Sequence, residues 1–264
     1  MNRSSGARIG ATTVVGALSL ALITGCGGES DEAKGSDGSS SPTQAAKVLG
    51  AAELKKLIIA QGDVDGYTVK AVPSTYPASK SAIKGDEQCK PLVYVFSGLA
   101  PGDAVAETNT MASEEKKPTD AASKSLGDLS EDEIEDALNE SMSAAVTVVS
   151  LSSYEGDGAE KTMKTVSDAI EGCSGGFTAG SGDDEQKFTK VTAEKAQGTG
   201  DESVAFAASG EMEGTGGQSA VHAQVVRHGN TVATYYTMNL GAMMTGKDYT
   251  VPAPVIDAQA AKLK

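Results

Sequence analysis

AAVTVVSLSSYEGDGAEKTMKTVSDAIEGCSGGF, residues 144–177, contains the clearest strand and the clearest helix of the chain. The β-branched residues of 146–154 predict a central strand. A Gly-Asp-Gly turn follows, and Asp157 with Glu160 three residues later predicts the start of a helix. The apolar residues of this helix repeat at helical spacing and include Cys173, so we expect Cys173 to face the protein interior.

The beginning of the chain has the organisation of an export signal. Two arginines precede an apolar run, residues 9–23, that is short for a membrane span. The run ends in Ile-Thr-Gly-Cys, residues 23–26, which resembles the bacterial lipobox, whose cysteine receives a diacylglyceryl group before cleavage. We predict that residues 1–25 are removed as a lipoprotein signal peptide and that acyl chains on Cys26 anchor the protein at the extracytoplasmic face of the cell membrane. The alternative is an ordinary cleaved signal peptide with an incidental cysteine.

The composition after Cys26 predicts a tether followed by one domain. Residues 26–44 are rich in Gly, Ser and acidic residues and have no apolar periodicity, which indicates a flexible spacer. Residues 45–264 form the predicted domain. Removal of residues 1–25, which contain two of the 22 basic residues and none of the 36 acidic ones, changes the formal charge from −14 to −16. This charge disfavours binding to nucleic acid or to an anionic membrane surface, so membrane attachment depends on the acyl chains, and we expect a monomer.

Three cysteines are an odd number for an exported protein. Assigning Cys26 to the lipid leaves Cys89 and Cys173, and we predict a disulfide between them. The loop of about 84 residues that it closes corresponds to roughly 4 to 5 kcal/mol in the chain-entropy model. Two free buried thiols or half of a metal site are the alternatives. Zinc is disfavoured because the chain has only two histidines, and no metal or cofactor is expected.

The last third of the chain predicts a meander of strands that ends in a well-defined hairpin. Residues 219–228 and 231–240 alternate in polarity and are joined by Gly229-Asn230. With a two-residue loop, one face of this hairpin is apolar. It consists of Val221, Ala223 and Val225 opposite Met238, Tyr236 and Thr234.

The other face of the hairpin groups hydrogen-bonding side chains on a rigid element, as binding sites do. These side chains are His222, Gln224, Tyr235 and Thr237, and we predict them as the candidate ligand-binding residues. The alternative is an ordinary solvent-facing sheet surface.

The remaining periodicity predicts short helices and strands around this framework. The predicted helices are at 51–60, directly after Cys89, at 130–138 and from Pro254 onward, and the other strands are at 67–72, 104–111, 187–194 and 203–209. The segment 73–84 is predicted as a loop. We therefore expect a single α+β domain with an antiparallel sheet of five to seven strands and helices packed on one face.

No catalytic motif is evident in the sequence. The chain contains no G-x-S-x-G element. His222 and His228 lie six residues apart on one predicted strand, which is too far for them to share a metal ion. We expect a protein that is not an enzyme.

Several segments resemble a known group of proteins. They are VSLSSYEGDGAE at 149–160, CSGGF at 173–177 and VVRHGNTVAT at 225–234. With the lipobox they resemble actinobacterial lipoproteins of unassigned function, and the layout is more distantly similar to the extracellular sensor domains of mycobacterial serine/threonine receptor kinases. Those domains are thought to carry two disulfides and a polar ligand cleft. This chain can form one disulfide and has no kinase domain, so no functional residue is carried over.

These features predict a lipid-anchored protein of the cell envelope whose domain binds a small ligand or an envelope protein without catalysis. An envelope hydrolase with an unrecognised active site is one alternative, and an accessory or scaffold subunit of a membrane complex is another. An apolar enclosed pocket would favour ligand binding. Convergent Ser, His and acidic side chains in a cleft would favour a hydrolase, and a flat apolar patch would favour a scaffold.

Overall fold

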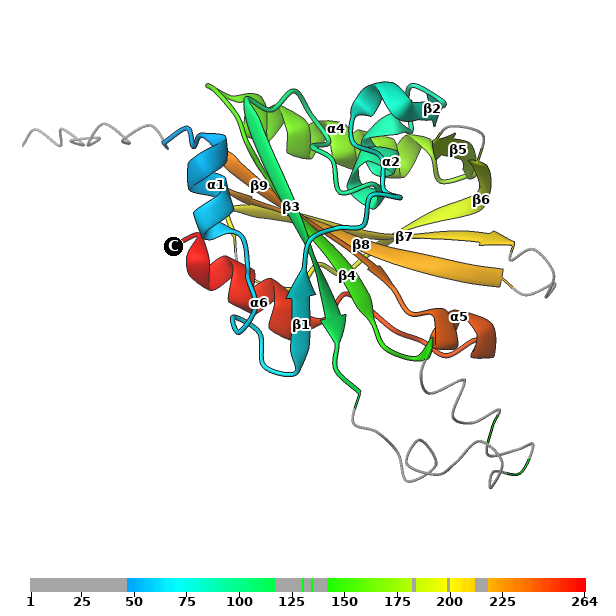
Figure 1. Ribbon diagram of the computed structural model, residues 1–264. Coiled ribbons are helices and arrows are strands. Elements are labelled where there is room, and N and C mark those ends of the chain that lie inside the picture. The colour runs from blue at the N-terminus through cyan, green and yellow to red at the C-terminus, as the bar shows by residue number, and fades with distance from the viewer. Residues whose placement is uncertain are drawn as a thin grey trace, which may run out of the picture. The chain divides into compact units, whose positions relative to one another are not determined.

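The centre of the fold is one antiparallel sheet, to which the described residues contribute nine strands (Figure 1). This computed structural model describes residues 47–116, 130, 134, 142–181, 184–198, 200–211 and 218–264. They belong to a compact unit that runs from Ala45 to Lys264.

The strands follow one another across the sheet in the order β1-β3-β4-β9-β8-β7-β6-β5-β2. Their bounds are β1 Tyr67–Lys70, β2 Ile83–Gly85, β3 Ala106–Glu114, β4 Val146–Ser153, β5 Phe177–Ser181, β6 Asp184–Glu194, β7 Glu202–Glu211, β8 Gln218–His228 and β9 Thr231–Met238. The described helices are α1 Ala51–Leu57, α2 Lys90–Phe96, α4 Gly158–Gly172, α5 Leu240–Thr245 and α6 Ala253–Lys262, with a 3₁₀ turn η1 at Lys80–Ala82.

The predicted strand and helix of residues 144–177 are confirmed as β4 and α4. After β4, which pairs with β3 and β9, α4 passes along the sheet and contacts β6, β7 and β8. The meander from β5 to β9 then returns the chain to β4 (Figure 1). The pairing of β4 with β9 therefore closes the fold through segments that are distant in the sequence.

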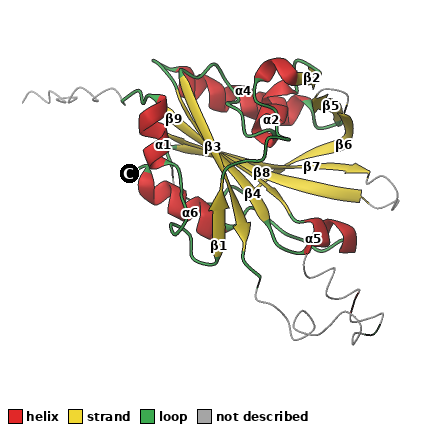
Figure 2. Ribbon diagram, viewed as in Figure 1, coloured by secondary structure: helices red, strands yellow, loops and turns green. Residues whose placement is uncertain are grey.

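Helices cover both faces of the sheet, so the prediction that they pack on one face is wrong (Figure 2). Residues 147–153 of β4 are all buried, which requires a cover on each side. Adjacent residues of one strand join different clusters: Val225 packs with α2 and α4, and Val226 packs with α1 and α6. We call the side of the sheet covered by α2 and α4 the α2/α4 face, and the side covered by α1 and α6 the α1/α6 face.

The sheet is also larger than predicted, because two of its nine strands are short and were not predicted from the local sequence pattern. β2 lies in the segment predicted as a loop, and β5 lies where the start of the meander was expected. Residues 83–85 of β2 pair with 179–181 of β5, so the partner strand defines β2 as a strand. The helix α5 was also not predicted.

The start of α4 differs from the prediction in one detail. Asp157 is the N-cap residue as expected, but its side chain makes no capping hydrogen bond. Its carboxylate instead forms an exposed ion pair with Lys161, with a distance of 2.8 Å. The side chain of Lys161 thus competes with the helix backbone for this carboxylate.

The predicted signal peptide, the predicted lipidation site Cys26 and the predicted tether lie outside the described residues, as does most of the helix predicted at 130–138. Within the part of the chain that the structure describes, no helix has the length and apolar character needed to cross a membrane.

Candidate ligand-binding cavity

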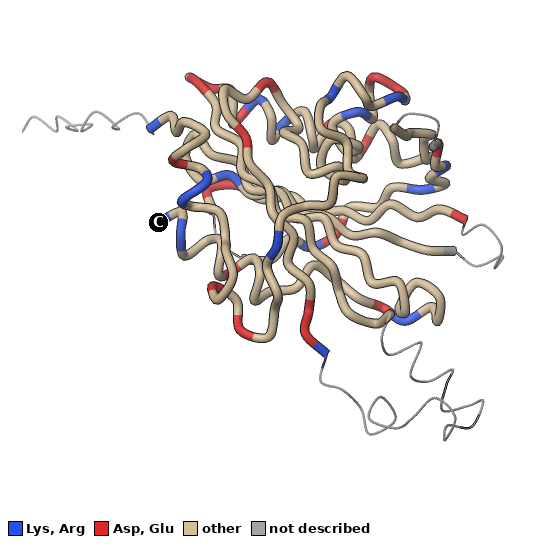
Figure 3. The backbone as a smooth tube through the Cα atoms, viewed as in Figure 1, with Lys and Arg blue, Asp and Glu red and all other residues tan. Residues whose placement is uncertain are grey.

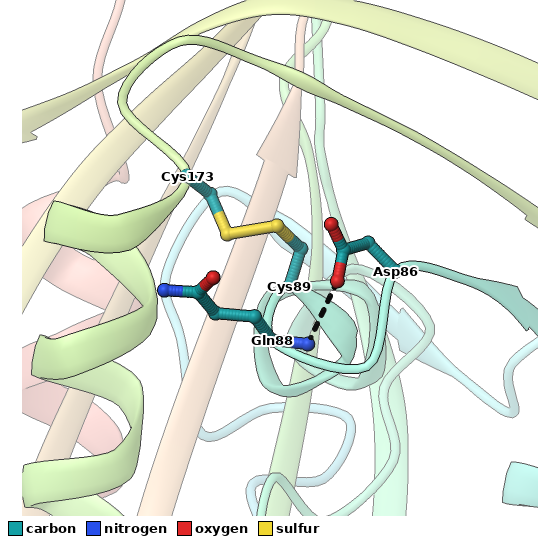
Figure 4. Close-up of a disulfide and its surroundings, with 4 residues drawn as sticks. All are labelled: Asp86, Gln88, Cys89 and Cys173. Carbon is teal, nitrogen blue, oxygen red and sulfur yellow. Dashed lines mark hydrogen bonds between the residues drawn. A yellow bond between two sulfur atoms is a disulfide. The ribbon is translucent and has the colours of Figure 1, made fainter.

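The predicted disulfide between Cys89 and Cys173 is confirmed, and it joins the start of α2 to the end of α4 (Figure 4). The two Cα atoms are 6.0 Å apart, and both residues are buried. Beside the bridge, the backbone N–H of Gln88 donates a hydrogen bond of 3.1 Å to Asp86 (Figure 4). The bridge therefore fixes one end of α2 against α4.

An apolar cavity of about 320 Å³ lies at the other end of α2. Its walls come from segments that are far apart in the sequence. The buried or half-buried wall residues include Tyr76, Ile83 of β2, Val93 and Phe96 of α2, Phe188 of β6 and Tyr236 of β9. Thr75, Glu185 and Gln186 contribute exposed residues to the lining.

The aromatic side chains of this wall pack on one another and on Phe206, which does not line the cavity. The ring centroid of Phe96 lies 5.5 Å from those of Phe188 and Phe206 and 5.3 Å from that of Tyr236. Tilted rings at these separations attract one another beyond their area burial. Because the rings support each other from a helix and three strands, the wall of the cavity is preorganised.

Two of the polar groups of the cavity wall are the phenols of Tyr76 and Tyr236. Burial raises the pKa of Tyr76. Burial also raises the pKa of Tyr236, and the nearby Tyr76 and Tyr249 raise it further. Both hydroxyls therefore stay protonated at physiological pH and can donate hydrogen bonds to a ligand.

The four residues predicted to bind a ligand are brought together as the hairpin register required. His222 pairs with Thr237, and Gln224 pairs with Tyr235. However, Gln224, Tyr235 and Thr237 are buried, and the His222 side chain is 12 % exposed. The alternative of a solvent-facing sheet surface is therefore wrong, because these residues lie on the α1/α6 face, which is covered.

Most of these four side chains have partners within the protein. The amide of Gln224 accepts from the backbone N–H of Gln197, with a distance of 2.9 Å, and donates to the carbonyl of the same residue. The hydroxyl of Thr237 bonds to that of Thr147 at 2.9 Å.

His222 lies within 3.1 Å of the Glu194 carboxylate and edge-on to the Tyr249 ring. Tyr235 packs among the apolar residues of α6, and its hydroxyl has no hydrogen-bond partner among the described residues. A hollow of about 300 Å³ lies beside Gln224, so ligand binding by these residues stays a prediction.

The apolar cavity was not predicted as a site. Tyr236 was assigned to the apolar face of the hairpin, and that assignment is confirmed. Nothing local indicates that Phe96 packs on both Tyr236 and Phe188. In the part of the chain that the structure describes, no three His, Cys, Asp or Glu residues are grouped so that they could hold a metal ion.

No family model matches the chain, and no curated protein matches it. A solved structure to which the chain is similar is the extracellular domain of PknH from Mycobacterium tuberculosis. The TM-score is 0.44 and the identity is 10 %, over 81 % of this chain and 98 % of that chain. A TM-score and an identity this low carry no argument about this chain.

Proposed function

We propose that the domain is a non-catalytic binding protein that takes a small, largely apolar ligand into the cavity at the end of α2. The observation that carries this proposal is the buried aromatic wall of Phe96, Phe188 and Tyr236 beside about 320 Å³ of space. Ligand pockets have volumes of about 300 to 1,000 Å³, mostly apolar walls and a few placed polar groups. The Tyr76 and Tyr236 hydroxyls supply such groups.

The affinity expected from this wall is modest. Removing about 200 Å² of apolar ligand surface from water contributes about 5 kcal/mol. A hydrogen bond to one of the phenols adds about 1 kcal/mol. The loss of ligand freedom on binding offsets several kcal/mol of this gain, so we expect dissociation constants in the millimolar range.

Part of the proposal concerns location. Acyl chains on Cys26 hold the domain at the extracytoplasmic face of the membrane, where the acidic chain has no electrostatic means of attachment of its own. Expression of Cys26→Ser in a bacterial host tests this through membrane fractionation. The variant is expected in the soluble fraction, and a variant that stays in the membrane fraction overturns the anchor.

The cavity is tested by titrating the domain with N-phenyl-1-naphthylamine, a neutral apolar fluorophore whose emission rises in apolar surroundings. Ser97→Leu introduces a larger side chain at a buried position of the cavity lining, and Ser97→Ala is the matched control at the same site. We expect the Leu variant to lose the fluorescence rise and the Ala variant to keep it. Equal binding by the two folded variants would contradict the proposed site.

A second pair of variants remains informative if Ser97→Leu does not fold. Tyr235 and Tyr236 are neighbours on β9, but Tyr236 lines the cavity and Tyr235 lies on the opposite face of the sheet. Tyr236→Phe is expected to weaken binding of 1-octanol a fewfold, as measured by displacement of the fluorophore, because one hydroxyl is lost. Tyr235→Phe removes the same atom and is expected to leave binding unchanged. The reverse result would favour the predicted residues on the α1/α6 face.

A further inference from the structure

We propose that residues 71–79, which we call the strap, form a movable segment that closes over a ligand in the cavity and opens to release it. The strap connects β1 to the 3₁₀ turn η1 (Figure 1). The inference rests on the proposed function, since it concerns the access of ligands to the same cavity. Its basis is the position of the strap, its composition, its few hydrogen bonds and its two fixed ends.

The strap forms one side of the cavity. Thr75, Tyr76 and Pro77 line the cavity together with residues of α2, β5 and β6. Tyr76 and Pro77 are half-buried, whereas Thr75 is exposed, as is the lining residue Gln186 of β6. These exposed lining residues place the mouth of the cavity at the strap and β6. A ligand that enters there passes the strap.

The composition of the strap allows it to lie against an apolar wall without burying a charge. Residues 71–79 contain no charged side chain, although the chain has 22 basic and 36 acidic residues. Figure 3 shows this segment, which follows β1, in tan. Moving a charged group out of water is costly. A neutral segment therefore closes over an apolar ligand more easily than a charged surface segment would.

Few hydrogen bonds hold the middle of the strap. The N–H of Tyr76 donates to the carbonyl of Pro73 at 3.0 Å, and the carbonyl of Ser79 accepts from the N–H of Ala82 at 3.2 Å. The Ser79 hydroxyl bonds to that of Ser81 at 2.8 Å. Across the described residues, no hydrogen bond joins the strap to the sheet or to α2. Segments with few hydrogen bonds and few buried contacts open locally at a lower free energy than the whole domain unfolds.

Both ends of the strap are fixed. Lys70, which precedes it, belongs to β1, and its carbonyl accepts a hydrogen bond of 2.9 Å from the Thr110 hydroxyl of β3. Lys80, which follows it, donates a hydrogen bond of 2.6 Å to the carbonyl of Gly102. The Lys80 ammonium also lies 4.9 Å from the centroid of the Tyr94 ring of α2. The strap can therefore move between two anchored points while β1 and α2 stay in place.

Hydrogen–deuterium exchange followed by mass spectrometry tests the motion, with benzyl alcohol as a neutral, water-soluble probe of the cavity. In the free protein, the strap amides are expected to exchange on the order of a hundredfold faster than those of β4. Because the open strap does not enclose the probe, benzyl alcohol at about ten times its dissociation constant should slow this exchange about tenfold. The turn at 61–66 does not line the cavity, so its exchange should be the same with and without the probe.

Two Ala-to-Gly substitutions test whether the motion contributes to binding. Ala78→Gly adds backbone freedom in the strap, at an exposed residue that does not line the cavity. The open strap gains more from this freedom than the closed one. Benzyl alcohol should therefore bind about twofold to fivefold more weakly, as measured by displacement of N-phenyl-1-naphthylamine. Ala60→Gly makes the same change at an exposed residue outside the strap and should leave the affinity unchanged.

The outcomes separate this inference from the proposed function. If benzyl alcohol binds but leaves the exchange of the strap unchanged, or if the free strap exchanges as slowly as β4, the inference fails while the cavity remains a binding site. Equal affinities of the Ala78→Gly and Ala60→Gly proteins also overturn it. If neither the fluorophore nor benzyl alcohol binds, both proposals fail. Protection of the strap by the probe, together with weaker binding in Ala78→Gly, supports the inference.

Discussion

On the α1/α6 face of the sheet, buried glutamines bind the backbone of the segments that cover them, whereas on the α2/α4 face a disulfide and packed aromatic rings hold the layers together. Gln259 of α6 accepts a hydrogen bond from the N–H of Ile59 and donates one to the carbonyl of Leu57, each at 2.9 Å. It thereby supplies hydrogen-bond partners for the backbone at the end of α1. Gln224 does the same for Gln197. The α2/α4 face instead has Cys89–Cys173 and the rings around Phe96.

This difference explains why hydrogen-bonding residues on a strand are a poor guide to a ligand site in this protein. The N–H and the carbonyl of a buried side-chain amide both need hydrogen-bond partners, and the backbone that covers the sheet supplies them. The polar residues of the hairpin therefore bind other parts of the protein interior and are not free for a ligand. A disulfide and tilted rings constrain the layers at a few points. They leave space at the end of α2, where the β2, β5 and β6 segments form the wall.

The largest effect is expected from removing the bridge of the α2/α4 face. Cys89→Ser with Cys173→Ser should lower the free energy of unfolding by about 4 to 5 kcal/mol, because the unfolded chain regains the freedom of an 84-residue loop. Urea unfolding followed by circular dichroism measures this loss. Cys26→Ser, the matched substitution outside the described fold, should leave the unfolding free energy unchanged. A loss below about 1 kcal/mol in the double variant would show that packing alone holds α2 in place.

The next effect concerns the amides of the α1/α6 face. Gln259→Leu leaves the Ile59 N–H and the Leu57 carbonyl without their partner, and we expect a loss of about 3 kcal/mol in unfolding free energy. Gln186→Leu, at an exposed residue that lines the cavity, should change it by no more than about 0.5 kcal/mol. The same urea experiment compares the two variants. Similar losses in both would contradict the contrast drawn between the faces.

The smallest effect is a pH dependence at the hairpin end of β8. Burial lowers the pKa of His228, and the opposing charge of Asp201 does not reverse this shift. The unfolded chain then binds more protons than the folded one, so the contribution of His228 is present above pH about 6.5 and is lost as the pH falls towards its lower folded pKa.

We expect this contribution to be below about 1 kcal/mol, since the ring is only partly buried. The urea midpoint of the wild type should therefore fall from pH 7 to pH 5, and His228→Gln should reduce this fall. An unchanged pH dependence in the variant would show that other groups cause it.

Several elements were predictable because their signals are local. The β-branched residues 146–149 of β4, the helical repeat that places Cys173 inward and the Gly229-Asn230 turn each depend on residues that are neighbours in the chain. The disulfide followed from the count of cysteines together with this inward position. By contrast, β2 has three residues and is a strand because β5 lies beside it.

The residues of the hairpin show the same division on the scale of single side chains. Alternation alone puts Tyr235 and Tyr236 on opposite faces of β9, because successive strand residues point to opposite sides of a sheet. Whether each face is open or closed depends on α6, on the segment around Gln197 and on α2, which pack there from distant parts of the chain. The periodicity of the chain thus determines which side chains share a face. Long-range packing determines which of them become interior partners and which line a cavity, because burial depends on the segments that fold over them.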